Sequence, residues 1–263
     1  MAIHLREVQP EGPARGTVMC VHGFPETSYM WRQLLDDLAA DGWRAVAPDL
    51  PGYGDSPYEG DGSWEAQVAA LDRVWTEHDL GPVVLVVHDW GGIIGLRWAL
   101  QRPEAIRALV ISDTGFFSDG QWHDFAQVLR TPGEGETFIA QWNPTMLGQL
   151  LSSVSTGIGE DAVAEYARAL DTDDGRKGVL ELYRSGDFDK IEDGCLAQLT
   201  QPALVLWGEA DPFAPVGGGH RFVRELPDAE IVVVEGAGHF VYEDDPAACS
   251  AAVKAFLDAR FPA

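Results

Sequence analysis

Apolar-rich runs of four or five residues recur along the chain, and each is followed closely by a polar residue or a glycine. They cover residues 17–21, 44–47, 83–87, 108–112, 203–207 and 231–234. Short continuous apolar runs, unlike alternating ones, are typical of strands that are buried on both faces of a parallel sheet. The pattern therefore predicts a mostly parallel sheet with helices on both faces.

Between these runs, apolar residues recur at helical spacing over residues 31–40, 63–78, 91–101 and 246–260. Ser63 has the side chain of a helix N-cap, and Pro246 suits the first turn of a helix. Strands and helices that alternate in this way predict an α/β fold with a sheet of about seven strands.

The alternation of strands and helices stops after residues 108–112. From residue 115 to residue 199 the chain has helical fragments, several glycines and prolines and many aromatic residues, but no strong buried strand. We interpret this stretch as a helical insertion. The expected organisation is an α/β core formed by residues 1–114 and 200–263, with a helical cap at residues 115–199.

The composition narrows the class of protein. Of the 263 residues, 46% are hydrophobic and 10% are aromatic, so a large core is available. Acidic residues outnumber basic ones by 42 to 18, which gives a formal net charge of −24. This charge argues against a nucleic acid or an anionic membrane as a partner, and it disfavours anionic substrates.

Targeting and metal signals are weak in this sequence. No apolar run reaches the ~20 residues that a membrane span needs, and residues 1–8 lack the apolar stretch of a signal peptide. The three cysteines have neither metal-binding nor disulfide spacing. We therefore expect a cytoplasmic monomer or homodimer without cofactor or metal, which acts on a small apolar substrate and water.

Ligands of open α/β sheets bind at the carboxyl ends of the strands, so the residues that follow each run are the candidates for chemistry. Asp89 comes shortly after residues 83–87, and Gly91 and Gly92 follow it. Strand, tight turn and helix in this order are typical of a nucleophile elbow, which pushes one side chain into the cleft. Because a helix N-terminus favours an anion, we expect Asp89 to be ionised and nucleophilic.

Two further residues complete a candidate triad. His239 lies on a glycine-rich loop after the last predicted strand, where it would be the general base. Asp211 follows the preceding strand and would orient His239 and stabilise its protonated form. Asp113, after the middle strand, is a rival for this acid role. His22 and His88 are interpreted as structural.

The order of nucleophile, acid and histidine resembles the α/β-hydrolase fold over essentially the whole sequence. Residues 22–26, His-Gly-Phe-Pro-Glu, resemble the oxyanion loop of epoxide hydrolases and their relatives. This resemblance implies an oxyanion hole made by the backbone N–H groups of Phe24 and Trp90. One departure is Val87, two positions before Asp89, where the family usually has a small residue and where a β-branched side chain would crowd the elbow.

An aspartate at the elbow indicates a particular chemistry. A carboxylate is a poor acyl acceptor, but it suits backside attack on a saturated carbon that bears a leaving group, and the product is an ester on the enzyme. His239 would then activate water to hydrolyse the Asp89 ester, while the oxyanion hole stabilises the tetrahedral intermediate. By this feature the chain resembles epoxide hydrolases and dehalogenases.

The leaving group separates these two activities. An opening epoxide needs a proton, and the segment around Tyr183 resembles the end of epoxide hydrolase caps, which makes Tyr183 the candidate acid. A departing halide needs only N–H donors, and Trp90, Trp122 or Trp142 would supply them or line the substrate pocket together with Pro25. We favour an epoxide hydrolase, with a haloalkane dehalogenase as the alternative. A non-catalytic binding protein on the same fold is a weaker alternative.

Overall fold

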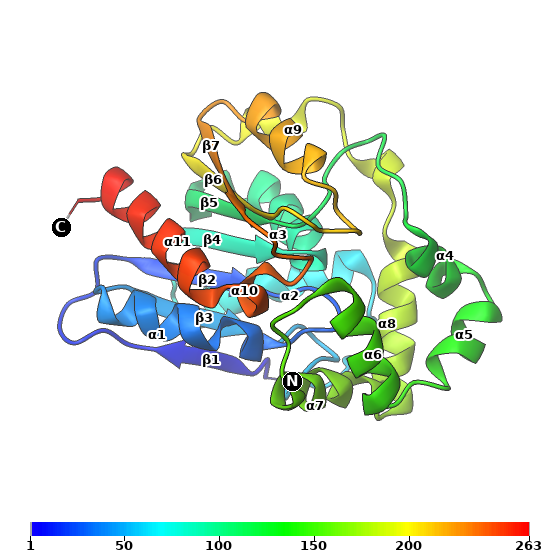
Figure 1. The fold of residues 1–263 in the computed structure, drawn as a ribbon. Helices are drawn as coiled ribbons and strands as arrows, with labels where there is room; N and C mark the ends of the chain where they lie inside the picture. Colours follow the sequence, from blue (N-terminus) through cyan, green and yellow to red (C-terminus); the bar gives the residue numbers. More distant parts are fainter. Residues whose placement is uncertain (1, 263) are drawn as a thin grey trace.

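The computed structural model describes residues 2–262 and contains one seven-stranded sheet (Figure 1). The strands lie in the order β1-β3-β2-β4-β5-β6-β7; β1 runs antiparallel to β3, and all other neighbours are parallel. The mostly parallel sheet predicted from the apolar runs is confirmed. Its strands are β1 (Leu5–Val8), β2 (Thr17–Val21), β3 (Arg44–Pro48), β4 (Val83–His88), β5 (Ile106–Ser112), β6 (Ala203–Gly208) and β7 (Ala229–Val234).

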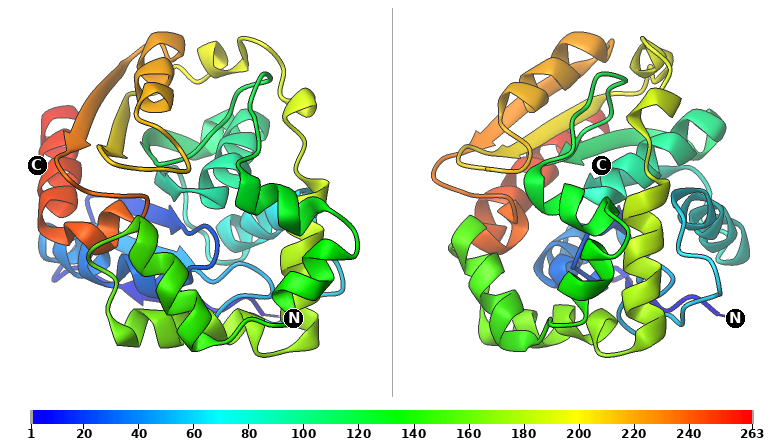
Figure 2. Two further views of the ribbon diagram at one scale, coloured as in Figure 1. Left: turned by 45° about the vertical axis from the view of Figure 1, so that its right-hand side comes forward. Right: turned by 90° about the vertical axis from the view of Figure 1, so that its right-hand side faces the viewer.

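Helices cover both faces of this sheet, which is why every residue of β2, β4 and β6 is buried. On one face α1 and α11 pack against each other, and on the opposite face α2 packs against α3 (Figures 1 and 2). A further helix, α9, packs against β6 and β7. The core helices are η1 (Ser28–Trp31), α1 (Arg32–Ala40), α2 (Trp64–Glu77), α3 (Trp90–Gln101), η2 (Pro103–Ala105), α9 (Gly217–Glu225), α10 (Val241–Asp244) and α11 (Pro246–Arg260).

Capping side chains determine where two of these helices begin. The Ser63 hydroxyl accepts the Ala66 N–H at 3.3 Å at the start of α2. At the start of α11, the Asp245 carboxylate accepts the Ala248 N–H at 2.9 Å, and Pro246 is the first helical residue. Such bonds satisfy amides that have no partner within the helix. The sequence signals at residues 63 and 246 therefore mark real helix starts.

A helical segment lies between β5 and β6, beyond the carboxyl ends of the strands (Figure 1). We call this stretch the cap segment. One of its helices, α8, packs against α4 and also against α2 of the core. The segment contains α4 (Asp124–Arg130), α5 (Glu134–Ile139), α6 (Pro144–Val154), α7 (Glu160–Ala167), η3 (Arg168–Leu170), α8 (Asp173–Ser185), η4 (Phe188–Lys190) and η5 (Cys195–Gln198). In residues 2–262, no helix is both long enough and apolar enough to cross a membrane.

The packing of β4 on α3 explains the β-branched residue beside the elbow. Val87 packs against α3 at Gly95, where an added Cβ would lie only 2.6 Å from Cγ1 of Val87. Two carbon atoms at that distance clash, so a side chain at residue 95 would force Val87 or the helix to shift. The space that Val87 needs is thus provided by a glycine on the facing helix.

Candidate active site

Asp89 occupies a strained turn between β4 and α3. Its φ of 50° and ψ of −124° are values that residues other than glycine rarely adopt. Glycines permit the turn, because a Cβ at Gly91 would lie 2.2 Å from the Val21 carbonyl oxygen and one at Gly92 2.3 Å from Oγ1 of Thr114. The Asp89 side chain makes no capping hydrogen bond to α3, so helix capping does not account for it. The turn has the layout of a nucleophile elbow.

The loop after β2 holds one oxygen of this carboxylate. The Phe24 N–H donates a hydrogen bond to Oδ1 of Asp89 at 2.7 Å. The loop can approach this closely because residue 23 is a glycine: an added Cβ at Gly23 would lie 2.3 Å from the same oxygen. Trp90 is the first residue of α3, where backbone N–H groups have no partner within the helix. Both predicted oxyanion donors therefore flank Asp89.

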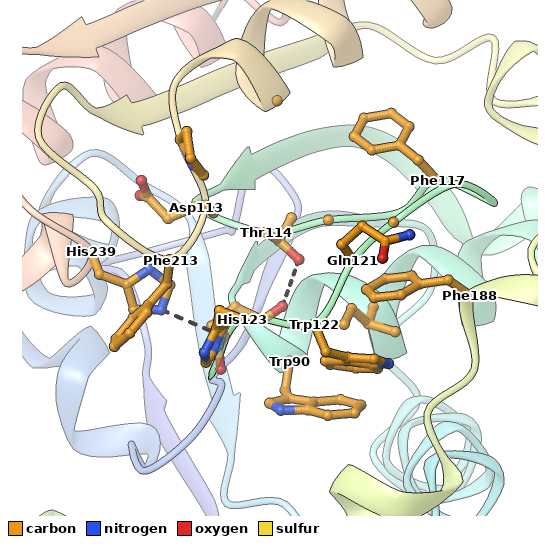
Figure 3. Close-up of a pocket in the computed structure, with 17 residues that line it drawn as sticks. Trp90, Asp113, Thr114, Phe117, Gln121, Trp122, His123, Phe188, Phe213 and His239 are labelled. Carbon is orange, nitrogen blue, oxygen red and sulfur yellow. Dashed lines mark hydrogen bonds and ion pairs between the residues drawn. The ribbon is translucent and has the colours of Figure 1, made fainter. Parts of the chain in front are cut away.

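His239 lies between two carboxylates. Its Nε2 is 3.5 Å from Oδ2 of Asp89, an ion pair drawn as a dashed line from His239 in Figure 3. Its Nδ1 is 2.8 Å from Oδ2 of Asp211. The other oxygen of Asp211 accepts the N–H groups of Phe213 at 2.7 Å and Ala214 at 3.0 Å, which fixes the carboxylate. Because the Asp211 carboxylate can only accept, Nδ1 carries a hydrogen and Nε2 faces Asp89. The structure thus brings the three predicted triad residues together.

The charges of these groups stabilise one another. Burial alone would raise the pKa of Asp89, but the hydrogen bond and the charge of His239 outweigh it, and the pKa is lowered. Burial alone would lower the pKa of His239, but the charge and hydrogen bond of Asp211, together with Asp89, raise it well above its usual value. Burial also opposes the charge of Asp211, and His239 again outweighs it and lowers the pKa. The resting site is a protonated histidine between two ionised carboxylates.

Asp113, the rival for the acid role, has a different environment. It follows β5 in a turn with φ of 43°, and its Oδ1 accepts the Gly208 N–H at 2.9 Å. Its Oδ2 is buried without a hydrogen-bond partner. Burial, reinforced by the charge of Asp211, raises the pKa of Asp113 well above its usual value, so this carboxyl group is neutral. The geometry assigns the histidine contact to Asp211.

A buried ion pair between His88 and Glu26 holds the backbone next to the site. His88 Nδ1 lies 2.8 Å from Oε2 of Glu26, and the same oxygen accepts the Gly23 N–H at 3.2 Å. Burial would lower the pKa of His88, but the charge and hydrogen bond of Glu26 raise it to about 9. His88 Nε2 donates to the His239 carbonyl oxygen at 2.8 Å. His22 Nδ1 lies 2.8 Å from the Gly23 carbonyl oxygen, so both histidines hold backbone around the elbow.

Two cavities meet at Asp89 and His239, and Figure 3 draws the residues that line the larger one. The larger has a volume of about 370 Å³, which suits a small molecule. The smaller, of about 20 Å³, is large enough for roughly one water molecule. Of the described residues that line them, none is a lysine or an arginine, and the protonated His239 is already paired with Asp89 and Asp211. Pro25, Phe24 and Tyr183 line the smaller cavity, and Trp90 and Trp122 line the larger one.

Stacked aromatic rings form one wall of the larger cavity. Trp122 lies between Trp90, with ring centroids 5.2 Å apart, and Phe188, at 4.5 Å. Trp142 does not join this wall and lines neither cavity. It stacks on Phe125 at 5.8 Å between ring centroids and packs against Phe24 at the same distance, so it lies behind residues that line the smaller cavity. Of the three tryptophans predicted for the pocket, the structure therefore places two there.

Tyr183 on α8 is the tyrosine of the cap segment that lines a cavity together with Asp89. It is 3% exposed, it lines the smaller cavity, and its ring packs edge-on against Trp90 with centroids 5.1 Å apart. Burial, reinforced by the charge of Asp89, raises the pKa of Tyr183 well above its usual value, so the hydroxyl keeps its proton. Tyr166 on α7 lines neither cavity and donates its hydroxyl hydrogen to Glu243 instead.

Two residues that were not predicted from the sequence, His123 and Phe213, line both cavities. Their rings stack with centroids 4.5 Å apart next to His239 (Figure 3). His123 Nδ1 accepts the Ala126 N–H at 3.3 Å, which leaves the ring hydrogen on Nε2. A histidine directly after Trp122, in a cap rich in aromatic residues, was the only signal in the sequence for this position.

One group of side chains in the described residues has the geometry to approach a metal ion: His4, Asp49 and Asp55. The Asp49 carboxylate is already occupied there. It accepts the Ser28 N–H at 2.7 Å and the Asp55 N–H at 2.9 Å, and its Oδ2 lies 2.8 Å from His4 Nδ1. Asp49 lines neither cavity, so this group is better explained as the brace of a loop.

Comparison with known proteins agrees with this geometry. A model of the α/β hydrolase fold matches residues 16–246, which include the elbow, Asp211 and His239. The chain belongs to the α/β hydrolase fold family. Within this family the elbow, the acid and the histidine occur in the chain order seen here.

Its relatives are enzymes with several different activities. The chain is 29% identical to a cis-3-alkyl-4-alkyloxetan-2-one decarboxylase of Xanthomonas campestris, over 94% of this chain and 90% of the relative. It is also 29% identical to a haloalkane dehalogenase of Mesorhizobium japonicum, over 94% of this chain and 85% of the relative. The crystal structure of the epoxide hydrolase VrEH1 from Vigna radiata superposes with a TM-score of 0.80 at 26% identity, covering 98% of this chain and 94% of that one. The protein is an α/β-hydrolase enzyme with relatives of both predicted types.

Proposed function

We propose that this α/β hydrolase converts a small neutral epoxide to a diol through a covalent ester on Asp89. The observation that carries the proposal is the environment of the Asp89 carboxylate. One of its oxygens accepts the Phe24 N–H at 2.7 Å, the other faces His239 at 3.5 Å, and Tyr183 lines the same small cavity. Residues suited to the roles of nucleophile, oxyanion donor, base and acid, namely Asp89, Phe24, His239 and Tyr183, therefore line one cavity.

In the first half-reaction, Oδ2 of Asp89 attacks a ring carbon of the epoxide and the ring C–O bond breaks. The alkoxide that forms takes the hydroxyl proton of Tyr183. Asp89 suits the attack because its lowered pKa keeps it ionised. Tyr183 keeps its proton at rest, since burial and the charge of Asp89 raise its pKa, and the alkoxide is a base strong enough to take that proton.

In the second half-reaction, the change of charge at Asp89 makes His239 a base. The carboxylate is one of the anions that raise the pKa of His239, and the ester that replaces it is neutral. The protonated His239 can then give a proton to the Tyr183 phenolate. As a neutral base it takes a proton from water, and this water attacks the ester carbonyl carbon. The N–H groups of Phe24 and Trp90 stabilise the oxyanion, and collapse releases the diol, with His239 protonating its oxygen.

The cavity and the total charge both favour an uncharged substrate. None of the described residues that line the two cavities is a lysine or an arginine, and the formal net charge is −24. A haloacid would bring its own carboxylate beside Asp89, where the one neighbouring cation, His239, is already shared by the carboxylates of Asp89 and Asp211. We therefore propose a neutral substrate that fills part of the 370 Å³ cavity.

The alternative activity is dehalogenation of an alkyl halide. The observation that favours it is the pair of stacked indoles, Trp90 and Trp122, on the wall of the larger cavity. Indole N–H groups can solvate a departing halide, whereas an alkoxide needs a proton. The first half-reaction would then use the same Asp89 attack and would leave Tyr183 without a role in chemistry.

A panel of three substrate classes tests the proposal. Diol formation from neutral epoxides, bromide release from bromoalkanes and carbon dioxide release from a cis-3-alkyl-4-alkyloxetan-2-one are measured with the purified enzyme. The third class is included because of the similarity to the decarboxylase. We expect diol to be the main product. Bromide or carbon dioxide release without diol formation would replace the proposed substrate class.

The Tyr183→Phe variant tests the leaving-group assignment. Loss of a general acid typically costs about 10²-fold or more, so epoxide turnover should fall by this factor. The matched control is Tyr58→Phe, because the Tyr58 hydroxyl also contacts α8, through Glu181, but lines neither cavity. Its turnover should stay close to that of the wild type. Unchanged epoxide turnover in Tyr183→Phe would remove Tyr183 from the mechanism.

A further inference from the structure

A single carboxylate joins the cap segment to the loop that carries His239. Oδ2 of Asp244 accepts the Gly238 N–H at 2.6 Å, next to the base. Oδ1 of the same side chain accepts the Thr156 and Gly157 N–H groups, each at 2.7 Å, and also the Ser155 hydroxyl. Thr156 and Gly157 lie in the loop that follows α6 of the cap segment. We call Asp244, Gly238 and residues 155–157 the cap latch.

The two backbones beside the cap latch are in direct contact. The His239 N–H donates to the Val154 carbonyl oxygen, at the end of α6, at 3.0 Å. An added Cβ at Gly238 would lie 2.1 Å from that carbonyl oxygen, and one at Gly157 would lie 2.0 Å from the Glu243 carbonyl oxygen. Each side of the contact thus has a glycine where any side chain would push the backbones apart.

The helix that is tied to His239 also lines the site. Leu150, Leu151 and Val154 of α6 line the smaller cavity together with Asp89 and His239. On the other side, the His239 carbonyl oxygen accepts a hydrogen bond from His88 of β4 at 2.8 Å. The backbone of the base is therefore held between the sheet and the cap segment, and a shift of α6 would move it.

We propose that Asp244 is a positioning residue, which through the cap latch keeps His239 in place only while α6 is seated over the site. The Nε2 of His239 lies 3.5 Å from Asp89, at the limit of useful contact, so a small displacement would cost much of its effect. This inference rests on the proposed function, because it assigns His239 to one half-reaction only.

The proposal predicts different effects on the two half-reactions. Attack by Asp89 on the substrate needs the elbow, the leaving-group donor and an ionised carboxylate, which the charge of His88 and the Phe24 N–H support besides His239. Neither His88 nor the Phe24 N–H is part of the cap latch. Hydrolysis of the Asp89 ester needs His239 next to the ester. Weakening the cap latch should therefore slow ester hydrolysis and spare ester formation, whereas general loss of structure would slow both.

The test uses Asp244→Asn, which replaces an oxygen acceptor by an amide donor among N–H groups. Rapid quenching and mass spectrometry follow the Asp89 ester during turnover of an epoxide. We expect ester hydrolysis to slow by at least about 10-fold, ester formation to change by less than about 3-fold, and the ester to accumulate. The control is Glu136→Gln, which removes an ion pair between Glu136 and Arg184 inside the cap segment, with bonds of 2.8 Å. It should leave both rates unchanged.

Amide hydrogen exchange supplies a readout that needs no substrate. In Asp244→Asn, peptides covering residues 150–157 and residues 236–241 should exchange faster together, because the same carboxylate orders both. Equal slowing of both half-reactions, or normal ester hydrolysis, would overturn the proposal. If no ester forms in any variant, the proposed function is wrong, and hydrogen exchange alone then tests the cap latch. Unchanged exchange in either peptide would show that Asp244 does not order both segments.

Discussion

At the scale of single residues, two buried aspartates beside the base differ in charge. Asp211 shares a hydrogen with His239 Nδ1 at 2.8 Å and accepts two backbone N–H groups, and its pKa is lowered. Asp113 accepts one N–H group and is otherwise unpaired, and burial together with the charge of Asp211 raises its pKa. The two carboxyl groups therefore respond differently to the same substitution.

Replacing each of these aspartates by asparagine tests this difference. Asp211→Asn removes the charge that supports protonated His239 and disturbs its tautomer, so ester hydrolysis should fall by about 10²-fold to 10⁴-fold. Asp113→Asn replaces one neutral group by another of the same shape, so turnover should change by less than about 3-fold. Steady-state diol formation measures both. A larger loss in Asp113→Asn than in Asp211→Asn would reverse the assignment of the acid.

The triad residues could be predicted from the sequence, whereas part of the pocket could not. Asp89, Asp211 and His239 each follow a recognisable buried strand, and the carboxyl ends of parallel strands meet at one edge of the sheet. Trp142 and His123 lie on or beside short cap helices. Which face of such a helix meets the site depends on packing between distant segments, so spacing along the chain does not reveal it.

At the scale of elements, β4 and α3 pack closely together on either side of the elbow. The six apolar runs correspond to β2 through β7, and residues 83–87 became Val83–His88 with one residue added. Continuous burial made these strands easy to recognise. The compensation of Val87 by Gly95 could not be predicted, because it joins a strand to the second turn of the next helix through packing alone.

Gly95→Ala tests this compensation. The added methyl group would lie 2.6 Å from Val87 Cγ1, so the free energy of unfolding should fall by about 1–3 kcal/mol, as overpacking does. Adding Val87→Ala should recover part of this loss. The control is Gly217→Ala, at the start of α9, where an added Cβ has no atom within 4 Å. Denaturant unfolding measures all variants, and equal effects of Gly95→Ala and Gly217→Ala would refute the packing argument.

At the scale of the whole molecule, the excess of 42 acidic over 18 basic residues creates long-range repulsion in the folded state. Salt screens such repulsion, because the Debye length falls from about 10 Å at 0.1 M to about 3 Å at 1 M. The Tm should therefore rise as KCl is increased, by about 2–4 °C for each kcal/mol gained. Scanning calorimetry in a KCl series checks this. A Tm that is constant or falls would show that the surface ion pairs matter more than the net charge.

The fold, the elbow and the cap segment all support the central proposal, which is that Asp89 becomes covalently bound to its substrate. His239→Gln tests it most directly, because this variant keeps the nucleophile and removes the base that releases the ester. The variant is incubated with an epoxide, digested and examined by mass spectrometry. We predict that the peptide containing Asp89 gains the mass of the whole epoxide. If this peptide stays unmodified with epoxides and with bromoalkanes, while the wild-type enzyme turns either of them over, the covalent mechanism is wrong.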